Sequence, residues 1–170
     1  GTRAFVAGEE TFAHSLAVAE RGQVIAAVVL LPAMARLYSA SATEPAQCNG
    51  VLIHTSQPTD LAQASVLTAK ASLDPGHWPR GVPTFHRSFR ASLAYRLCLV
   101  AEGRHDAMLT LRDSWEWDIA AGALIATRAG ARVTDKTGLP LSFNAARPLA
   151  NGVIVASTDL HAQISGHLKA

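Results

Sequence analysis

The chain has 170 residues, of which 49% are hydrophobic and 16% charged, and its formal net charge is +2. This length and apolar content predict a folded domain with a buried core and exclude a disordered chain. The small net charge argues against a surface dedicated to DNA or RNA, which needs a strong basic stripe. The longest apolar run, residues 24–32, is too short to span a bilayer. We therefore expect neither a nucleic-acid polymer nor a membrane as a partner.

Cysteine and histidine usage excludes several classes of site. Cys48 and Cys98 lie far apart in the chain and predict neither a metal-binding pair nor a disulfide framework, which favours a reducing, cytoplasmic location. The seven histidines show no zinc-binding spacing. The chain has no G-x-S-x-G elbow and no P-loop motif, which disfavours serine hydrolases and P-loop nucleotide hydrolases.

The first half of the chain predicts mainly strands. Residues 11–20, 23–31 and 36–40 are rich in apolar and β-branched residues and predict an antiparallel meander. Asp60 is suited to cap a short helix, and residues 65–71 predict a further strand. Residues 74–83 contain three prolines and two glycines and predict a loop.

The second half alternates helices and strands. Apolar spacing predicts helices over residues 91–102 and 117–128, each followed by a glycine, and strands over 105–111, 131–135 and 152–157. Thr158 or Asp159 is expected to cap a last helix that ends near Leu168. This alternation predicts one layered α/β domain over residues 1–170.

The most informative segment is Trp115–Gly122, which is followed closely by Ala129–Val133. It places two indoles and two acids at the start of a helix rich in alanine and glycine. Small residues at a helix start allow close approach of another backbone or a phosphate, and backbone N–H groups there attract anions. Asp118 could hold a divalent cation beside that anion, an arrangement typical of metal-dependent phosphatases. The alternative is that Asp118 only stabilises the helix dipole and that Trp115, Glu116 and Trp117 pack the helix start.

Five segments resemble the inositol monophosphatase superfamily in order and spacing. Residues 117–122 and 129–135 resemble its W-D-x-A-A-G and A-G-x-x-x-x-D signatures, residues 48–50 its C-N-G turn, residues 98–103 its C-L-V-A-x-G helix end, and residues 1–6 the tail of D-P-x-D-G-T-x-x-F. The resemblance covers nearly the whole chain. It implies the C-terminal part of a layered αβαβα sandwich, with Mg²⁺ as the cofactor of a phosphoric monoester hydrolase.

The resemblance also implies what the chain lacks. In the family, the two aspartates of D-P-x-D come directly before the segment that matches Gly1 and Thr2, and a Glu-Glu pair lies further upstream. These residues supply most of the metal ligands. We therefore expect this chain alone to be inactive, and we expect apolar surface and strand edges to be exposed where N-terminal helices cover the sheet in the family. A homodimer is a further expectation.

The family's functional residues carry over to seven positions. The resemblance implies that Thr2 orients the attacking water, that the backbone of Gly1 and Thr2 lies near the phosphate, and that Asp118 binds the metal. Substrate contacts are implied for Ser92, Arg96, Arg112 and Trp117. Arg96 could instead be a solvated helix residue. Six basic and aromatic residues also allow two interpretations: Arg80, Arg87, Arg90, Arg96, Phe85 and Phe89. They form either a solvated loop with two core aromatics or a patch that faces the phosphates.

Within the superfamily, the chain most resembles CysQ-type 3′(2′),5′-bisphosphate nucleotidases. Glu102-Gly103, Trp117 and the lack of glutamate at residues 110–112 favour adenosine 3′,5′-bisphosphate as the small phosphorylated substrate. Leu93 and Ala94 depart from the serines that nucleotidases carry. One alternative is an inositol-1-monophosphatase or general sugar monophosphatase. The other is an inactive fragment or binding module.

Overall fold

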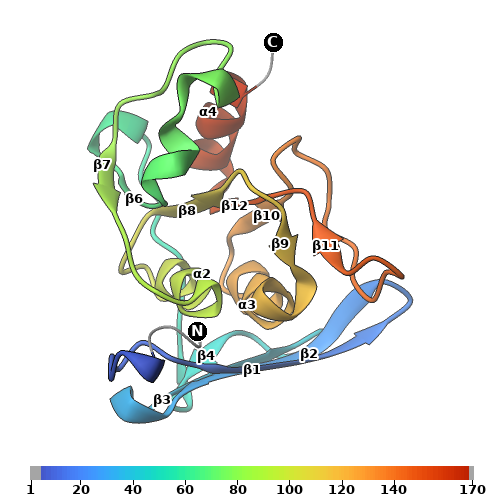
Figure 1. Cartoon of the computed structure of the whole chain (residues 1–170). Helices are drawn as coiled ribbons and strands as arrows, with labels where there is room; N and C mark the ends of the chain where they lie inside the picture. The colour runs from blue at the N-terminus through green and yellow to red at the C-terminus, as the bar shows by residue number, and fades with distance from the viewer. Residues whose placement is uncertain (1–4, 169–170) are drawn as a thin grey trace.

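The computed structural model describes residues 5–168 and shows four stacked layers in the order helix, sheet, helices, sheet (Figure 1). One outer layer is a five-stranded antiparallel sheet whose strands follow chain order. Its strands are β1 (His14–Glu20), β2 (Gln23–Leu31), β3 (Arg36–Ser41), β4 (Gln47–Cys48) and β5 (Val51–Leu52). The predicted meander is therefore confirmed, although β1 begins three residues later than residue 11.

The second sheet has the strand order β10-β12-β8-β6-β7. Its strands are β6 (Ser65–Leu67), β7 (His86–Ser88), β8 (Ala107–Thr110), β10 (Arg132–Thr134) and β12 (Val153–Ala156). β6 pairs parallel to β7 and β8, and the other pairs are antiparallel. The strand expected over residues 65–71 ends at Leu67 because a 3₁₀ helix, η3 (Lys70–Leu73), follows it. The loop expected over residues 74–83 contains another, η4 (Pro75–His77).

Three α-helices flank the second sheet on its two faces. α2 (Leu93–Ala101) and α3 (Glu116–Arg128) lie between the sheets, and α4 (Thr158–Leu168) covers the opposite face (Figure 1). Successive side chains of β12 point to opposite faces of the sheet, which explains this arrangement. Val153 and Val155 lie in the core around α2 and α3, whereas Ile154 lies in the core under α4. The expected layered α/β sandwich is thus confirmed, and none of these helices is long and apolar enough to cross a membrane.

The smaller elements fix the chain between these layers. Asp60 caps η2 (Leu61–Gln63) as predicted, since its carboxylate accepts a hydrogen bond from the Ala62 N–H at 2.9 Å. The 3₁₀ helix η1 (Pro32–Met34) joins β2 to β3. A two-stranded sheet forms from β9 (Ser114–Trp115) and β11 (Leu149–Ala150), which the sequence did not predict.

The two inner helices approach closely where α3 carries a glycine. A Cβ atom placed on Gly122 would lie 2.6 Å from the Cβ of Leu97 on α2 and 2.7 Å from its Cδ1. Leu97 is fully buried, so it cannot move aside into solvent. Gly122 therefore serves helix packing, and its close neighbour is α2.

The outer face of the first sheet is apolar and open to solvent. Strand register places Leu16 opposite Val28 and Leu30 opposite Leu37, on the face away from α3. The exposed fractions are 61% for Leu16, 56% for Val18 and 43% for Leu37. None of α2, α3 and α4 covers this face (Figure 1). Exposed apolar strand surface of this kind favours association, and the expected homodimer stays a prediction.

Candidate active site

The start of α3 is held in place by backbone pairing and by a buried carboxylate. Trp115 pairs with Leu149 in the small β9–β11 sheet and directly precedes the helix. Glu116 is only 8% exposed, and its carboxylate accepts hydrogen bonds from the N–H groups of Asn144 at 2.6 Å and Ala145 at 3.3 Å. Glu116 therefore anchors the loop that precedes β11, in agreement with the packing alternative.

The two tryptophans do not pack into the core. Their rings stack on each other with centroids 4.6 Å apart and an interplanar angle of 9°. Trp115 is 44% exposed and Trp117 is 57% exposed. Trp117 also lines a cavity of about 600 Å³, between β1 and the loop anchored by Glu116. The two indoles therefore present an aromatic surface beside the helix start.

Asp118 lies in the first turn of α3 with an exposed side chain. It forms no hydrogen bond or ion pair with any residue between 5 and 168, so its carboxylate is free for a ligand. A hard carboxylate oxygen suits Mg²⁺. However, the described residues contain no group of three or more potential metal-ligating side chains. Asp118 thus fits one ligand of a metal site that the described part of the chain does not complete.

Arg96 is buried, which excludes the alternative of a solvated helix residue. It is 6% exposed, its Nε donates to the Arg90 carbonyl at 2.5 Å, and its guanidinium lies 4.4 Å from the centroid of the Phe89 ring. Burial, and then the nearby charge of Arg112, lower the pKa of Arg96 to about 10. Arg96 and Arg112 are therefore close enough to interact, and Arg112 is the exposed member of the pair.

The remaining predicted substrate residues have mixed outcomes. Ser92 caps α2 with a positive φ of 65°, and its hydroxyl accepts a hydrogen bond from the Tyr95 N–H at 3.3 Å. In the segment proposed for substrate choice, Thr110 and Leu111 are buried and only Arg112 is exposed. Gly1 and Thr2 lie outside the described residues, so their expected role stays a prediction.

The basic and aromatic set is not a single patch. Arg90 and Arg96 meet at Phe89, whereas Arg80 lies against α4. Phe89 is 48% exposed, so the core interpretation is wrong for it. Phe85 packs against the core under α4, as that interpretation predicted. The cover that Phe89 provides for Arg96 had no signal in the sequence, because the two residues are in contact only after the chain turns into α2.

Glu102, which contributed to the nucleotidase resemblance, has a structural role. Its carboxylate pairs with Arg36 and accepts a hydrogen bond from the Tyr38 hydroxyl at 2.7 Å, which joins the end of α2 to β3. Burial, and then the bond to Glu102, raise the pKa of the fully buried Tyr38. Glu102 is therefore explained by packing and carries little information about the substrate.

Comparisons with known proteins agree with this architecture. The model of the inositol monophosphatase family matches residues 1–169. Inositol monophosphatase 2 of Solanum lycopersicum is 32% identical over 170 residues, which cover 95% of this chain and 62% of that protein. Nus factor SuhB of Vibrio cholerae is 35% identical over 146 residues, which cover 81% of this chain and 54% of that protein.

Among solved structures, the Thermotoga maritima inositol monophosphatase superposes with a TM-score of 0.82 at 29% identity, covering 98% of this chain and 64% of that one. The layered α/β sandwich of this chain is thus the fold of that inositol monophosphatase. The chain belongs to the inositol monophosphatase family. It spans between about half and two thirds of the length of these three relatives.

Proposed function

We propose that the whole protein is a Mg²⁺-dependent phosphomonoesterase that acts on small phosphorylated substrates. The observation that carries this proposal is Asp118, an exposed carboxylate without a partner among the described residues, in the first turn of α3. Family membership supports the same reaction class. When bound, Mg²⁺ would polarise the phosphate and lower the pKa of a coordinated water. The additional ligands would lie outside residues 5–168.

The chain's own residues have separate roles in this proposal. Asp118 would supply one metal ligand, and Thr2 would orient the attacking water. Arg112 would attract the phosphate, since it is exposed and its charge adds to that of Arg96. Arg96 is covered by Phe89 and would act mainly through this charge.

For the substrate, we propose adenosine 3′,5′-bisphosphate. The exposed Arg112 suits a second phosphate, and the stacked indoles of Trp115 and Trp117 suit the flat face of a base. The support from Glu102 is withdrawn because its carboxylate pairs with Arg36 and Tyr38. An inositol-1-monophosphatase or sugar monophosphatase is the second candidate, favoured by the name of the tomato relative.

The test is Mg²⁺-dependent phosphate release by the whole protein from adenosine 3′,5′-bisphosphate, myo-inositol 1-phosphate and fructose 1,6-bisphosphate. Asp118→Asn should lower kcat by at least about a hundredfold, as expected for loss of a group that stabilises transition-state charge. Asp159→Asn is the matched control, because Asp159 is also an exposed acid in a first helical turn, that of α4. Equal activity of Asp118→Asn and wild type would refute the assignment of Asp118.

The same panel separates the candidate substrates. A preference of tenfold or more for myo-inositol 1-phosphate would refute the nucleotidase and favour the second candidate. No turnover by the whole protein on any of the three substrates, with Mg²⁺ present and the fold intact, would favour a binding module without phosphatase activity.

A further inference from the structure

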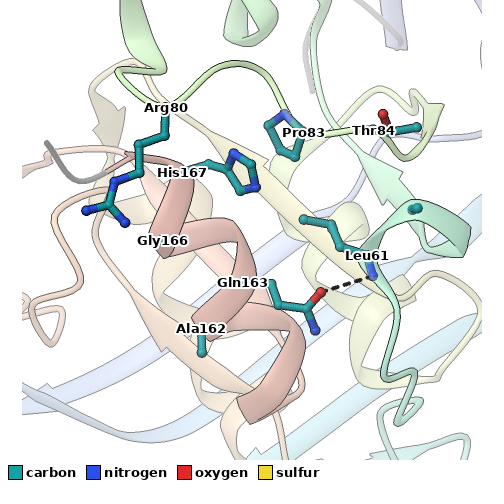
Figure 2. A pocket seen from close by; sticks show the side chains of 9 residues that line it. Leu61, Arg80, Pro83, Thr84, Ala162, Gln163, Gly166 and His167 are labelled. Carbon is teal, nitrogen blue, oxygen red and sulfur yellow. Dashed lines mark hydrogen bonds between the residues drawn. The ribbon is translucent and has the colours of Figure 1, made fainter.

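The two cysteines of the chain lie in the same part of the core, between the first sheet and the inner helices. Cys48 is on β4 and Cys98 is on α2, and both are free thiols buried in one hydrophobic cluster. This cluster is on the opposite side of the second sheet from the cavity beside α4, whose lining contains no cysteine and no acidic residue (Figure 2). Their separation in the sequence gave no reason to pair them.

Strand pairing directs the side chain of Cys48 toward α2. Cys48 is directly opposite Tyr38 in the β3–β4 ladder, so the two side chains lie on the same face of the sheet. The Tyr38 hydroxyl donates to the carboxylate of Glu102, at the end of α2, at 2.7 Å, so this is the inner face. Arg36 joins the two elements, because its guanidinium pairs with Glu102 and its Nη2 donates to Cys48 Sγ at 3.5 Å.

Helix periodicity places Cys98 on the face of α2 that meets these strands. Glu102 follows Cys98 by one helical turn, and its N–H donates to the Cys98 carbonyl at 2.9 Å, so the two side chains lie on the same face of the helix. Burial raises the pKa of the Cys98 thiol, and the charges of Cys48 and Glu102 raise it further. The two sulfurs are therefore close enough for their charges to interact.

The surroundings of the two sulfurs differ. Cys48 is 8% exposed and lies beside the partly exposed guanidinium of Arg36, and a nearby cation stabilises the negative charge on an attacking sulfur. Cys98 is 0% exposed, and its raised pKa keeps the thiol protonated. A small oxidant that enters from solvent therefore meets Cys48 first, and Cys98 supplies a second thiol behind it.

We propose that Cys48 and Cys98 form a peroxide-sensitive thiol pair, which closes to a reversible disulfide between β4 and α2. The Cys48 thiolate attacks hydrogen peroxide, so that a sulfur–oxygen bond forms, the peroxide bond breaks and hydroxide leaves. The sulfur of Cys98 then attacks the Cys48 sulfenic acid, the disulfide forms, and the hydroxyl group leaves as water with the Cys98 proton. Counting the proton that Cys48 lost first, two thiols are oxidised and one peroxide is reduced to two waters. The inference is independent of the phosphatase activity, since its readout is the oxidation state of sulfur.

The test treats the folded full chain with an excess of hydrogen peroxide, removes the peroxide with catalase and counts thiols after unfolding in guanidinium. We expect both thiols to be lost, the mass to fall by that of two hydrogen atoms, and proteolysis to release a linked peptide that contains Cys48 and Cys98. Dithiothreitol should restore both thiols. Retention of both thiols, addition of oxygen without a crosslink, or a disulfide only between two copies of the chain would each overturn the proposal.

Two variants assign the order of the steps. In Cys98→Ala the reaction should stop at the Cys48 sulfenic acid, which dimedone traps. Cys48→Ala should leave Cys98 as an unmodified thiol at the same dose of peroxide. Dimedone labelling of Cys98 in Cys48→Ala, without labelling of Cys48 in Cys98→Ala, would overturn the roles given to the two sulfurs. The peptide map of the wild-type chain needs neither variant and still decides whether the bond forms.

A thermal measurement tests whether the fold already places the two sulfurs for bonding. A disulfide that closes a long loop without strain stabilises the folded state, so the oxidised chain should have a Tm about 4–15 °C above that of the reduced chain. Cys98→Ala, which cannot form the bond, is the control and should show no rise in Tm after the same treatment. A lower Tm for the oxidised wild-type chain would show that α2 or β4 has to move to form the bond, and it would overturn the inference.

Discussion

Replacing Gly122 by alanine tests how closely α2 and α3 approach. Alanine removes the glycine cost in a helix and on this ground alone would stabilise the protein by about 1 kcal/mol. The new Cβ, however, would lie 2.6 Å from the Cβ of Leu97, so the two buried helices must separate by nearly an ångström. Overpacking of this kind costs about 1–3 kcal/mol and occasionally more. An approach of 2.6 Å between two Cβ atoms puts the steric cost in the upper part of that range, about 2–3 kcal/mol, so we expect a net loss of about 1–2 kcal/mol.

Gly166→Ala is the matched control, because it is a helical glycine whose added Cβ meets nothing within 4 Å. It should raise stability by about 0.5–1 kcal/mol, and the two substitutions should differ in sign. Urea unfolding followed by circular dichroism measures both. For a chain of this size, the loss at Gly122 corresponds to a decrease in Tm of about 2–8 °C. Equal or greater stability of Gly122→Ala relative to wild type would refute the close helix contact.

Three further predictions concern the network at Glu102, a histidine and the open sheet face. Glu102→Gln leaves the charge of Arg36 uncompensated in a partly exposed pair and should cost about 1–3 kcal/mol by urea unfolding, while the exposed Glu44→Gln should be neutral. Burial, and then the charge of Arg90, lower the pKa of His105 below its usual 6.5. The stability that neutral His105 contributes is therefore fully present above pH 6.5 and is lost as the pH falls through the lowered pKa. His105→Gln should flatten this pH dependence of stability, and an unchanged pH profile would contradict the assignment. Leu16→Lys should reduce self-association in sedimentation experiments, whereas unchanged association would show that the outer face is not responsible.

The layers of the fold were largely predictable from local patterns. Apolar and β-branched content predicted the first three strands. Helical spacing with terminal glycines predicted α2 and α3, and a cap at Thr158 or Asp159 predicted α4. The short strands β4, β5, β7, β9 and β11 were not predicted. Each has only two or three residues, and its pairing comes from partners elsewhere in the chain, so the local sequence carries too few positions for a pattern.

The candidate site shows the same division. The sequence placed Asp118 and Trp117 in the first turn of a helix, because this depends on neighbouring residues alone. It could not show that Arg96 lies under Phe89 or that Glu102 pairs with Arg36, since these contacts join residues that only packing brings together. The sequence also could not distinguish two helical glycines: only the structure shows that Gly122 is crowded by Leu97 and that Gly166 faces open space.

The sequence by itself therefore determined the class of fold, the family and the candidate metal-binding carboxylate, because these depend on the order and local spacing of residues. The tertiary structure alone decided which charged side chains are available to a ligand. Exposure and pairing are set by the layers that pack around each residue, which is why Arg112 and Arg80 remain open to solvent while Arg96, Glu102 and Glu116 are engaged within the protein.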